Sequence, residues 1–375
     1  MDSILSLKRV ESLSKIVLLR PQSAILSMSN RKKIVFVANP ISGTQGKEQV
    51  LKCIESNIDR EKYAPEILLT EYAGHAAEIA AQKAREGIFA VVAVGGDGTI
   101  NEVARSLVHT QTALGIIPCG SGNGLARHVE IPMDAMRALR VINEALVSDV
   151  DYGTINDIPF FCTCGVGFDA FVSQKFADAG KRGPLTYIEK TLQEGLKYKP
   201  ETYELEIDGN PQRIKAFLIA VGNASQYGNN AYIAPQATIN DGQLDVTIME
   251  PFTVLDAPSI AIQLFSKQID QNSHIKTFRC RELRIIRSKA GIAHYDGDPI
   301  ELGAELHVKV VHRALKLIVP SESERSGSSP NVFVRAQEYF SGLKQFNEMI
   351  VEDIAQKNKA IIGKGKEQIK KLIDN

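Results

Sequence analysis

The chain has 375 residues, 44% of them hydrophobic and 23% charged, a length and composition that favour a globular protein of two domains. Lysine plus arginine and aspartate plus glutamate both number 44, so no overall charge favours nucleic acid or a membrane surface as a partner. The five cysteines are odd in number and include no CxxC pair, which argues against a disulfide framework or a zinc site and fits a reducing cytoplasm.

The first 150 residues divide into an N-terminal extension and an α/β domain. Residues 1–30 lack the patterning of a globular segment, whereas short apolar runs alternate with helical patterns from Lys33 onward. Strands are predicted at 34–38, 66–70, 89–94 and 114–117, and helices at 46–58, 74–86 and 100–108. The alternation predicts a parallel sheet over 31–150, completed at about 310–320, with helices on both faces.

Residues 151–310 have a different sequence pattern, in which short predicted strands are separated by residues typical of turns. Strands are predicted at 160–164, 203–207, 216–221, 244–248, 282–286, 306–311 and 315–319, with helices at 184–198 and 255–267. Turns are predicted at Asp208–Pro211, Asn240–Gly242 and Asp296–Pro299. The pattern predicts a mostly antiparallel second domain, a sandwich or an open barrel.

The chain ends in a polar linker, 321–330, and a segment, 331–375, with an apolar stripe at helical spacing. Its lysines make it a basic amphipathic helix, which can lie in a membrane interface or pack on protein. No apolar stretch approaches the roughly 18 residues that span a bilayer, so any membrane association is predicted to be peripheral.

The glycine-rich sequence Gly95-Gly96-Asp97-Gly98-Thr99 follows the third predicted strand. A tight glycine turn lets the backbone approach phosphate oxygens, and the N–H groups of the following helix can bind the same phosphates. A carboxylate cannot bind phosphate itself, so Asp97 is expected to hold a metal, orient a metal-bound water or accept a proton. The alternative interpretation is an ordinary turn between strand and helix.

Two further loops follow predicted strands and should lie at the same edge of the sheet. They are Asn39-Pro40-Ile41-Ser42-Gly43 and Gly120-Ser121-Gly122-Asn123-Gly124. Together with Gly95–Thr99, in this order, they resemble the nucleotide-binding motifs of the diacylglycerol kinase catalytic domain, shared by sphingosine and ceramide kinases and bacterial soluble lipid kinases. Further matches at Gly165–Ala170, Asn240–Asp245 and Tyr295–Asp298 extend the resemblance over roughly 33–320.

The resemblance implies a nucleotide-binding domain of the NAD kinase/phosphofructokinase-like fold, a β-sandwich domain that binds lipid, and ATP and Mg²⁺ as cofactors. The implied nucleotide-binding residues are Asn39, Pro40, Ser42, Gly43, Thr70, Gly95, Gly96, Gly98, Thr99, Asn101, Glu102, Gly120, Ser121, Gly122 and Asn123. The implied reaction is transfer of the γ-phosphate of ATP to a lipid hydroxyl.

Two carboxylates are candidates for the general base. The family places a glutamate at the position of Asp298, and the aspartate here is one methylene shorter. A shift of that size can lower a rate about 100-fold, so either the backbone compensates or Asp97 takes the proton.

Other members of the family imply two further sites. A structural Mg²⁺ would be held by Asp241 with main-chain carbonyls of Thr238 and Gln243, because Mg²⁺ prefers oxygen ligands. Asp169 is a candidate for contact with the lipid headgroup. For the Asn-Asp-Gly sequence at 240–242, a plain turn is an equally good interpretation.

The acceptor lipid is most simply diacylglycerol, which would give phosphatidic acid, and a long-chain base such as sphingosine is the alternative. An NAD kinase-like enzyme and a lipid-binding regulator with weak catalysis are the rival interpretations. The segment Gly43–Lys47 suggests a Walker A loop, but Ile41 and Glu48 stand where glycine and Ser or Thr belong. No nucleic-acid partner is expected, and a homodimer is compatible with the sequence.

Overall fold

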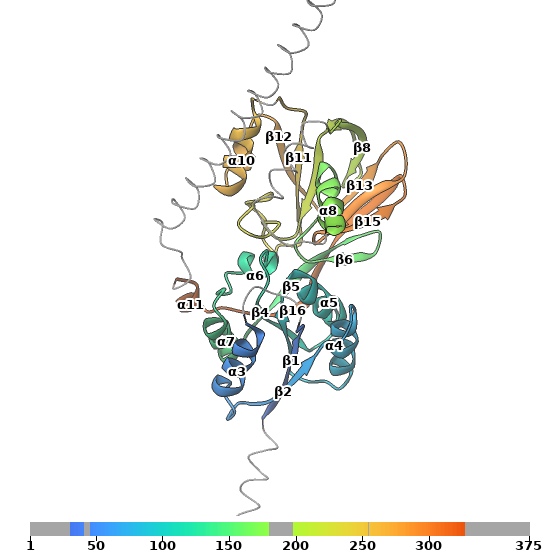
Figure 1. Cartoon of the computed structure of the whole chain (residues 1–375). Helices are drawn as coiled ribbons and strands as arrows, with labels where there is room; N and C mark the ends of the chain where they lie inside the picture. The colour runs from blue at the N-terminus through green and yellow to red at the C-terminus, as the bar shows by residue number, and fades with distance from the viewer. Residues whose placement is uncertain (1–30, 41–45, 180–197, 254, 327–375) are drawn as a thin grey trace, which may run out of the picture. The chain divides into compact units, whose positions relative to one another are not determined.

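The computed structural model describes residues 31–40, 46–179, 198–253 and 255–326, which group into two compact units (Figure 1). Within the described residues, unit 1 comprises 31–126, 131–149 and 314–321, and unit 2 comprises 127–130, 150–313 and 322–326. The N-terminal extension, the helix predicted at 184–198 (apart from Tyr198) and the tail at 331–375 lie outside the described residues. A short helix, α11 (Glu322–Ser326), lies within the segment expected to be a linker.

Unit 1 contains the predicted parallel sheet. Its strands are β1 (Lys32–Ala38), β2 (Tyr63–Leu69), β3 (Ala90–Gly95) and β4 (Ala113–Pro118), in the order β2-β1-β3-β4. The last residues of β16 (Glu305–Val319) pair with β4 in parallel through Leu317 and Leu114. Every residue of β3 and β4 is buried, as expected for strands covered by helices on both faces.

The helices of unit 1 lie on both faces of this sheet. Helices α3 (Lys47–Asn57) and α7 (Ala135–Glu144) pack together, as do α4 (His75–Arg85) and α5 (Asp97–Leu107) on the opposite side (Figure 1). Each has an apolar side that contributes to the core, such as Val103, Ala104 and Leu107 of α5. A one-turn helix, α6 (Gly124–His128), follows the loop after β4.

Helix α5 begins at Asp97, three residues before its predicted start at Ile100. The glycines made the sequence look like a turn, yet Gly96 is the single residue between β3 and the helix, with extended backbone at φ −94° and ψ −171°. An aspartate in the first turn is favourable because its charge faces the positive end of the helix dipole. The predicted phosphate-binding motif is therefore the first turn of a helix as well as a loop.

Unit 2 contains two antiparallel groups of strands. The first is a six-stranded sheet with the order β12-β11-β10-β7-β14-β15. Its members are β7 (Thr163–Gly167), β10 (Leu218–Gly222), β11 (Leu244–Met249), β12 (Ile275–Cys280), β14 (Gly291–Tyr295) and β15 (Asp298–Leu302). The second has the order β16-β13-β8-β9, with β13 (Glu282–Ile286), β8 (Glu201–Ile207) and β9 (Asn210–Ala216). In addition, β5 (Leu146–Ile155) pairs with β16, and β6 (Ile158–Phe160) pairs with β5.

The two groups of strands enclose one apolar core, which confirms the sandwich. Val166, Ile219 and Val246 of the first group pack with Leu205 and Leu283 of the second. A smaller apolar cluster contains residues of β10 and β11 with helix α10 (Ala257–Phe265), while helix α8 (Phe168–Ala179) packs on β7, β14 and β15. The 3₁₀ turn η1 (Ile269–Gln271) follows α10.

Several strands of unit 2 were missed or divided differently. β9 begins at Asn210, where a turn was predicted, because the two-residue turn Asp208–Gly209 is shorter than its sequence suggested; both residues have positive φ, as a tight hairpin requires. The strand predicted at 160–164 is divided between β6 and β7. The two last predicted strands are a single strand, β16.

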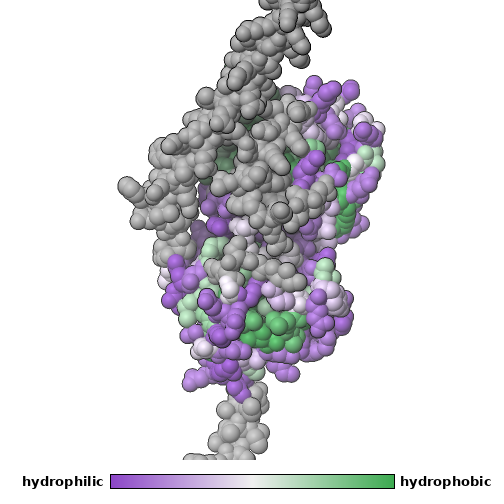
Figure 2. Space-filling view, in the orientation of Figure 1, coloured by the Kyte–Doolittle hydropathy of each residue, from purple (hydrophilic) through white to green (hydrophobic). Residues whose placement is uncertain are grey.

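The surface of the described residues is largely hydrophilic on the face drawn in Figure 2, with apolar groups between the polar ones. The strongest exposure of a large apolar side chain is that of Leu255, 87% exposed, just before α10. Phe265, at the end of the same helix, is 44% exposed. Among the described residues, no helix is both long enough and apolar enough to cross a membrane.

Candidate functional site

The loops after β3 and β4 meet at their glycines. A Cβ on Gly120 would lie 2.6 Å from the Cα of Gly96, and a Cβ on Gly96 would lie 3.2 Å from the Cα of Gly120. The first distance is too short for carbon atoms that are not bonded and the second is tight, so a side chain at Gly120 would push the two backbones apart. The sequence prediction that these loops gather at one edge of the sheet agrees with this contact.

Asp97 joins the same two loops through its carboxylate. Oδ2 accepts a hydrogen bond from the main-chain N–H of Asn123 at 2.8 Å, and Oδ1 accepts one from Gly124 at 2.7 Å. Two of the N–H groups that lack partners at the start of α6 are thereby satisfied. Hydrogen bonds from N–H groups to an ionised carboxylate are stronger than those between neutral groups. Asp97 thus has a positioning role that its sequence pattern did not reveal.

The loop after β4 is held by its own side chains as well. Asn123 has φ +52°, in the left-handed region, and its side chain both accepts from the N–H of Gly120 at 3.0 Å and donates to the Gly120 carbonyl at 2.7 Å. A Cβ on Gly122 would lie 2.6 Å from Asp97 Oδ2. Ser121 is exposed at the outside of this loop.

Contacts of Thr99 and Glu102 also hold the first turn of α5 in place. The Thr99 side chain fills the space that a Cβ on Gly95 would need, with Oγ1 2.5 Å from that position. Glu102 Oε1 accepts from the N–H of Gly74 at 2.9 Å, at the start of α4, and Asn101 is buried. Gly98 differs, because a Cβ there would meet nothing within 4 Å.

The ends of the two neighbouring strands carry the remaining predicted nucleotide-binding residues. Asn39 and Pro40 follow β1, and Thr70 follows β2, where its N–H donates to the Ala38 carbonyl at 2.9 Å. They therefore lie at the carboxyl edge of the sheet, the edge at which parallel α/β sheets bind ligands. Ser42 and Gly43 lie outside the described residues.

Lys47 is a functional candidate that the sequence analysis missed. It is the first residue of α3, and its Nζ donates to the Val94 carbonyl at 3.1 Å, one residue before Gly95. Burial lowers the pKa of its ammonium, and the nearby Cys119 acts in the opposite direction. The incomplete Walker A pattern at 43–47 was the available signal, since it placed a lysine after a glycine loop.

Asp298 begins β15, directly after a tight hairpin turn in unit 2. The turn residues Asp296 and Gly297 have φ +47° and +88°, the positive pair typical of a type I′ turn. The Asp296 carboxylate accepts from three main-chain N–H groups, those of Phe161, Cys162 and Thr163, at 2.7–3.1 Å. Asp298 is exposed beside this fixed turn.

Asp169 lies in the first turn of α8, in a buried polar cluster with two other side chains. Its Oδ2 is 2.8 Å from His294 Nε2 on β14, and the Tyr227 ring packs edge-on against the His294 ring. Burial raises the pKa of the Tyr227 phenol. The second ring nitrogen, His294 Nδ1, lacks a hydrogen-bond partner among the described residues.

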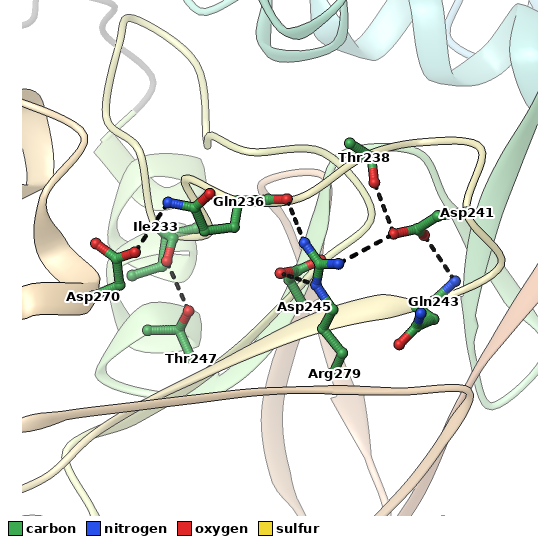
Figure 3. Close-up of polar contacts among 9 residues, drawn as sticks. All are labelled: Ile233, Gln236, Thr238, Asp241, Gln243, Asp245, Thr247, Asp270 and Arg279. Carbon is green, nitrogen blue, oxygen red and sulfur yellow. Dashed lines mark hydrogen bonds and ion pairs between the residues drawn. The ribbon is translucent and has the colours of Figure 1, made fainter.

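The loop predicted to hold a structural Mg²⁺ has a different arrangement (Figure 3). Asp241 Oδ2 accepts from the Thr238 hydroxyl at 2.7 Å, and Oδ1 accepts from the N–H of Gln243 at 3.0 Å. The guanidinium of Arg279 lies 3.6 Å from Oδ2. Because a cationic side chain already faces the carboxylate, these residues do not fit the predicted site. No group of three or more His, Cys, Asp or Glu side chains among the described residues is placed to hold a metal.

Two family models match the chain over most of its length. Residues 33–155 match the model described as diacylglycerol kinase catalytic domain. Residues 162–319 match the model described as YegS C-terminal NAD kinase beta sandwich-like domain. The two matches fall on the α/β and sandwich parts of the chain in the order that the sequence predicted.

Individual relatives show the same similarity. The chain is 25% identical over 298 residues to a protein of Bacillus subtilis named diacylglycerol kinase, covering 78% of this chain and 97% of the relative. It is 33% identical over 195 residues to a YegS-like protein of Chromohalobacter salexigens, named as a probable lipid kinase, covering 50% of this chain and 63% of the relative. A crystal structure of a diacylglycerol kinase from Bacillus anthracis has the same fold, with a TM-score of 0.61 at 20% identity over 77% of this chain and 97% of that one.

Proposed function

Because the chain belongs to the diacylglycerol kinase catalytic-domain family, we propose that it transfers the γ-phosphoryl group of MgATP to the hydroxyl group of diacylglycerol. The observation that carries the proposal is the junction of the Gly95–Thr99 and Gly120–Gly124 loops through Asp97. The name of the Bacillus subtilis relative supports diacylglycerol as the acceptor.

Unit 1 would bind the nucleotide. The N–H groups in the first turn of α5 have no partner one turn earlier in the helix and can donate to phosphate oxygens. Gly98 leaves open space beside them, while Asp97 directs its charge toward Asn123 and Gly124. Phosphoryl transfer depends mainly on such positioning and on neutralisation of charge, and MgATP itself brings the metal.

Lys47 would supply positive charge to the bound phosphates. We expect Lys47→Met to raise the KM for ATP about 10-fold, equivalent to about 1.4 kcal/mol, with a smaller change in the KM for lipid. Initial rates measured against ATP concentration give this value. Lys52→Met is the matched control, since Lys52 lies on the same helix and pairs with Glu48 at the surface. An unchanged KM for ATP in Lys47→Met would remove Lys47 from the site.

Unit 2 would supply the base for the acceptor. In the proposed step the Asp298 carboxylate takes the proton of the lipid hydroxyl, whose oxygen forms a bond to the γ-phosphorus. The bond from that phosphorus to the β–γ bridging oxygen breaks, and ADP leaves with that oxygen. Asp298 is proposed as the base because it occupies the position at which the family resemblance implies a catalytic carboxylate, while Asp97 joins the two loops of unit 1.

The buried cluster of Asp169, His294 and Tyr227 would orient the lipid headgroup or the groups next to it. His294 lies opposite Pro299 in the pairing of β14 with β15, one residue from Asp298, so the cluster supports the hairpin that carries the proposed base. Its unpaired ring nitrogen, His294 Nδ1, can form a hydrogen bond with a hydroxyl or an ester oxygen. A polar cluster of this kind distinguishes substrates strongly, because an apolar replacement leaves the cluster unpaired.

His294→Gln tests this role. We expect the KM for diacylglycerol to rise about 10-fold, with the KM for ATP unchanged within about 2-fold, since only lipid positioning is lost. The control is His307→Gln, because His307 is an exposed histidine that contacts Glu305 on β16. Equal rises in both KM values, together with a lower melting temperature, would indicate a purely structural histidine.

The function itself is tested by incubating the purified full chain with MgATP and a panel of acceptors in mixed micelles. The panel contains diacylglycerol, sphingosine, ceramide and NAD, and mass spectrometry identifies the products. Phosphatidic acid as the main product supports the proposal, and phosphosphingosine would reassign the acceptor within the same class. Phosphorylation of NAD alone, or of nothing, would overturn it.

A lipid acceptor also requires a way to reach the bilayer surface. The apolar side chains Leu255 and Phe265 are exposed at the two ends of α10, which is itself composed mainly of apolar residues. We propose that this helix gives unit 2 a peripheral contact with the membrane, in keeping with the behaviour of apolar helical segments at interfaces.

A further inference from the structure

Arg279 occupies the centre of a ring of oxygen atoms in unit 2 (Figure 3). Its Nε donates to Asp245 Oδ1 at 3.2 Å, and its Nη2 donates to the Gln236 carbonyl oxygen at 2.8 Å. Its Nη1 lies 3.6 Å from Asp241 Oδ2. Arg279 and Asp245 are also directly opposite each other in the pairing of β12 with β11, so the backbone fixes the contact.

The oxygens around this guanidinium are of the kinds that a divalent cation takes. Two carboxylates and a main-chain carbonyl are typical ligands of Mg²⁺ and Ca²⁺, which bind oxygen at about 2.0–2.6 Å. The Asp245 side chain is only 13% exposed, so its charge needs compensation from within the protein, whereas Asp241 lies nearer the surface. The positive charge of the guanidinium would repel a divalent metal ion that approached the same oxygens.

Arginine is well suited to such a position. Its charge does not vary over the ordinary pH range, and its planar group donates in several fixed directions at once. A divalent ion would satisfy the same oxygens only while its concentration remained high enough, and its loss would leave two carboxylates close together. The arginine therefore gives the 236–245 loop a permanent cation.

We propose that Arg279 serves as the built-in cation of the 236–245 loop, in place of a bound divalent metal, so that the stability of unit 2 does not depend on Mg²⁺. The proposal concerns the architecture of unit 2 and is independent of the lipid that the enzyme phosphorylates. The Thr238 hydroxyl and the Gln243 N–H add two neutral donors to the Asp241 carboxylate beside this cation.

The test measures melting temperature (Tm) on the full chain without nucleotide, in EDTA and at increasing MgCl₂ or CaCl₂. The quantity compared between proteins is the part of the metal-induced rise in Tm that is lost when Asp241→Asn is introduced. For the wild type this rise should stay below about 1 °C. Arg279→Met should lower the Tm in EDTA by about 3–6 °C. Added metal should raise the Tm of this variant again by about 2–4 °C, and the rise should level off at high metal concentration, as expected for binding to a site in the folded state.

Two further variants make the result specific. Arg281→Met removes an exposed arginine just after β12 and should change neither the Tm nor its response to metal. Arg279→Lys retains the positive charge but cannot bridge three oxygens. Its Tm should therefore be lower than that of the wild type and should not respond to metal. This variant provides the test if Arg279→Met does not fold. A saturable rise in the wild type that Asp241→Asn removes would overturn the proposal. So would an Arg279→Met protein that gains no such rise.

Discussion

Replacing Asp298 with asparagine is expected to lower the rate of lipid phosphorylation about 1000-fold, because a general base contributes roughly 10²–10⁴-fold to such a step. The amide keeps the shape of the side chain but cannot take the proton of the acceptor hydroxyl. ATP affinity should stay within about 2-fold, since no nucleotide contact is assigned to unit 2. Single-turnover rates with diacylglycerol and a separate equilibrium titration of ATP measure the two effects.

Asp157→Asn is the matched control for this prediction. Asp157 is an exposed carboxylate beside a tight turn, between β5 and β6, and it also lies in unit 2, so it should be replaceable without loss of rate. Asp298→Glu gives the side-chain length that the family resemblance implies at this position and should keep activity within about 10-fold of wild type. If Asp298→Asn retains full activity, the base is elsewhere and Asp97 becomes the first candidate.

Replacing Asp97 with asparagine should damage the nucleotide site through its structure. One of the two main-chain N–H groups, of Asn123 or Gly124, would face the amide nitrogen and lose its partner, and an unsatisfied buried donor costs about 1–3 kcal/mol. We expect a lower melting temperature and a loss of ATP affinity of about 100-fold, because the phosphate-binding loops no longer hold their relative positions. Thermal unfolding and ATP titration provide the measurements.

Gly120→Ala gives an independent test of the same junction. Its Cβ would clash with the Gly96 backbone without altering any charge, so it should reproduce the loss of ATP affinity seen in Asp97→Asn. Asp149→Asn is the control, because Asp149 is a carboxylate that pairs with Lys316 elsewhere in unit 1. If Gly120→Ala binds ATP normally, the junction of the loops does not shape the nucleotide site.

The fold could be predicted because its main signals are local. The buried strands β3 and β4 are continuous apolar runs, and the glycine turns after them are visible in the sequence. The structure confirms the parallel sheet and the antiparallel sandwich, and the family matches confirm the resemblance. The predicted strand boundaries were less accurate where polar residues form exposed strands, as in β9.

The contacts that build the site could not be predicted from spacing. Asp97 meets Asn123 and Gly124, 26 and 27 residues later, and the partner of Asp169 is 125 positions further along the chain. Such pairings depend on the register of neighbouring strands, which a single sequence does not reveal. Arg279 shows the same limit, since the sequence motif did not reveal that a cross-strand arginine faces Asp245 and Asp241.

The pairing of β4 with the end of β16 also has a consequence for synthesis on the ribosome. Leu114 meets Leu317, and the N–H of His109 donates to the Ala314 carbonyl, so the outer strand of the unit 1 sheet is made about two hundred residues after its neighbour. Until residue 319 has emerged, β4 is an apolar strand with an open edge, the feature that promotes aggregation. The nascent chain therefore carries an incomplete unit 1 sheet throughout translation of the sandwich, and its exposed apolar edge favours aggregation during that interval.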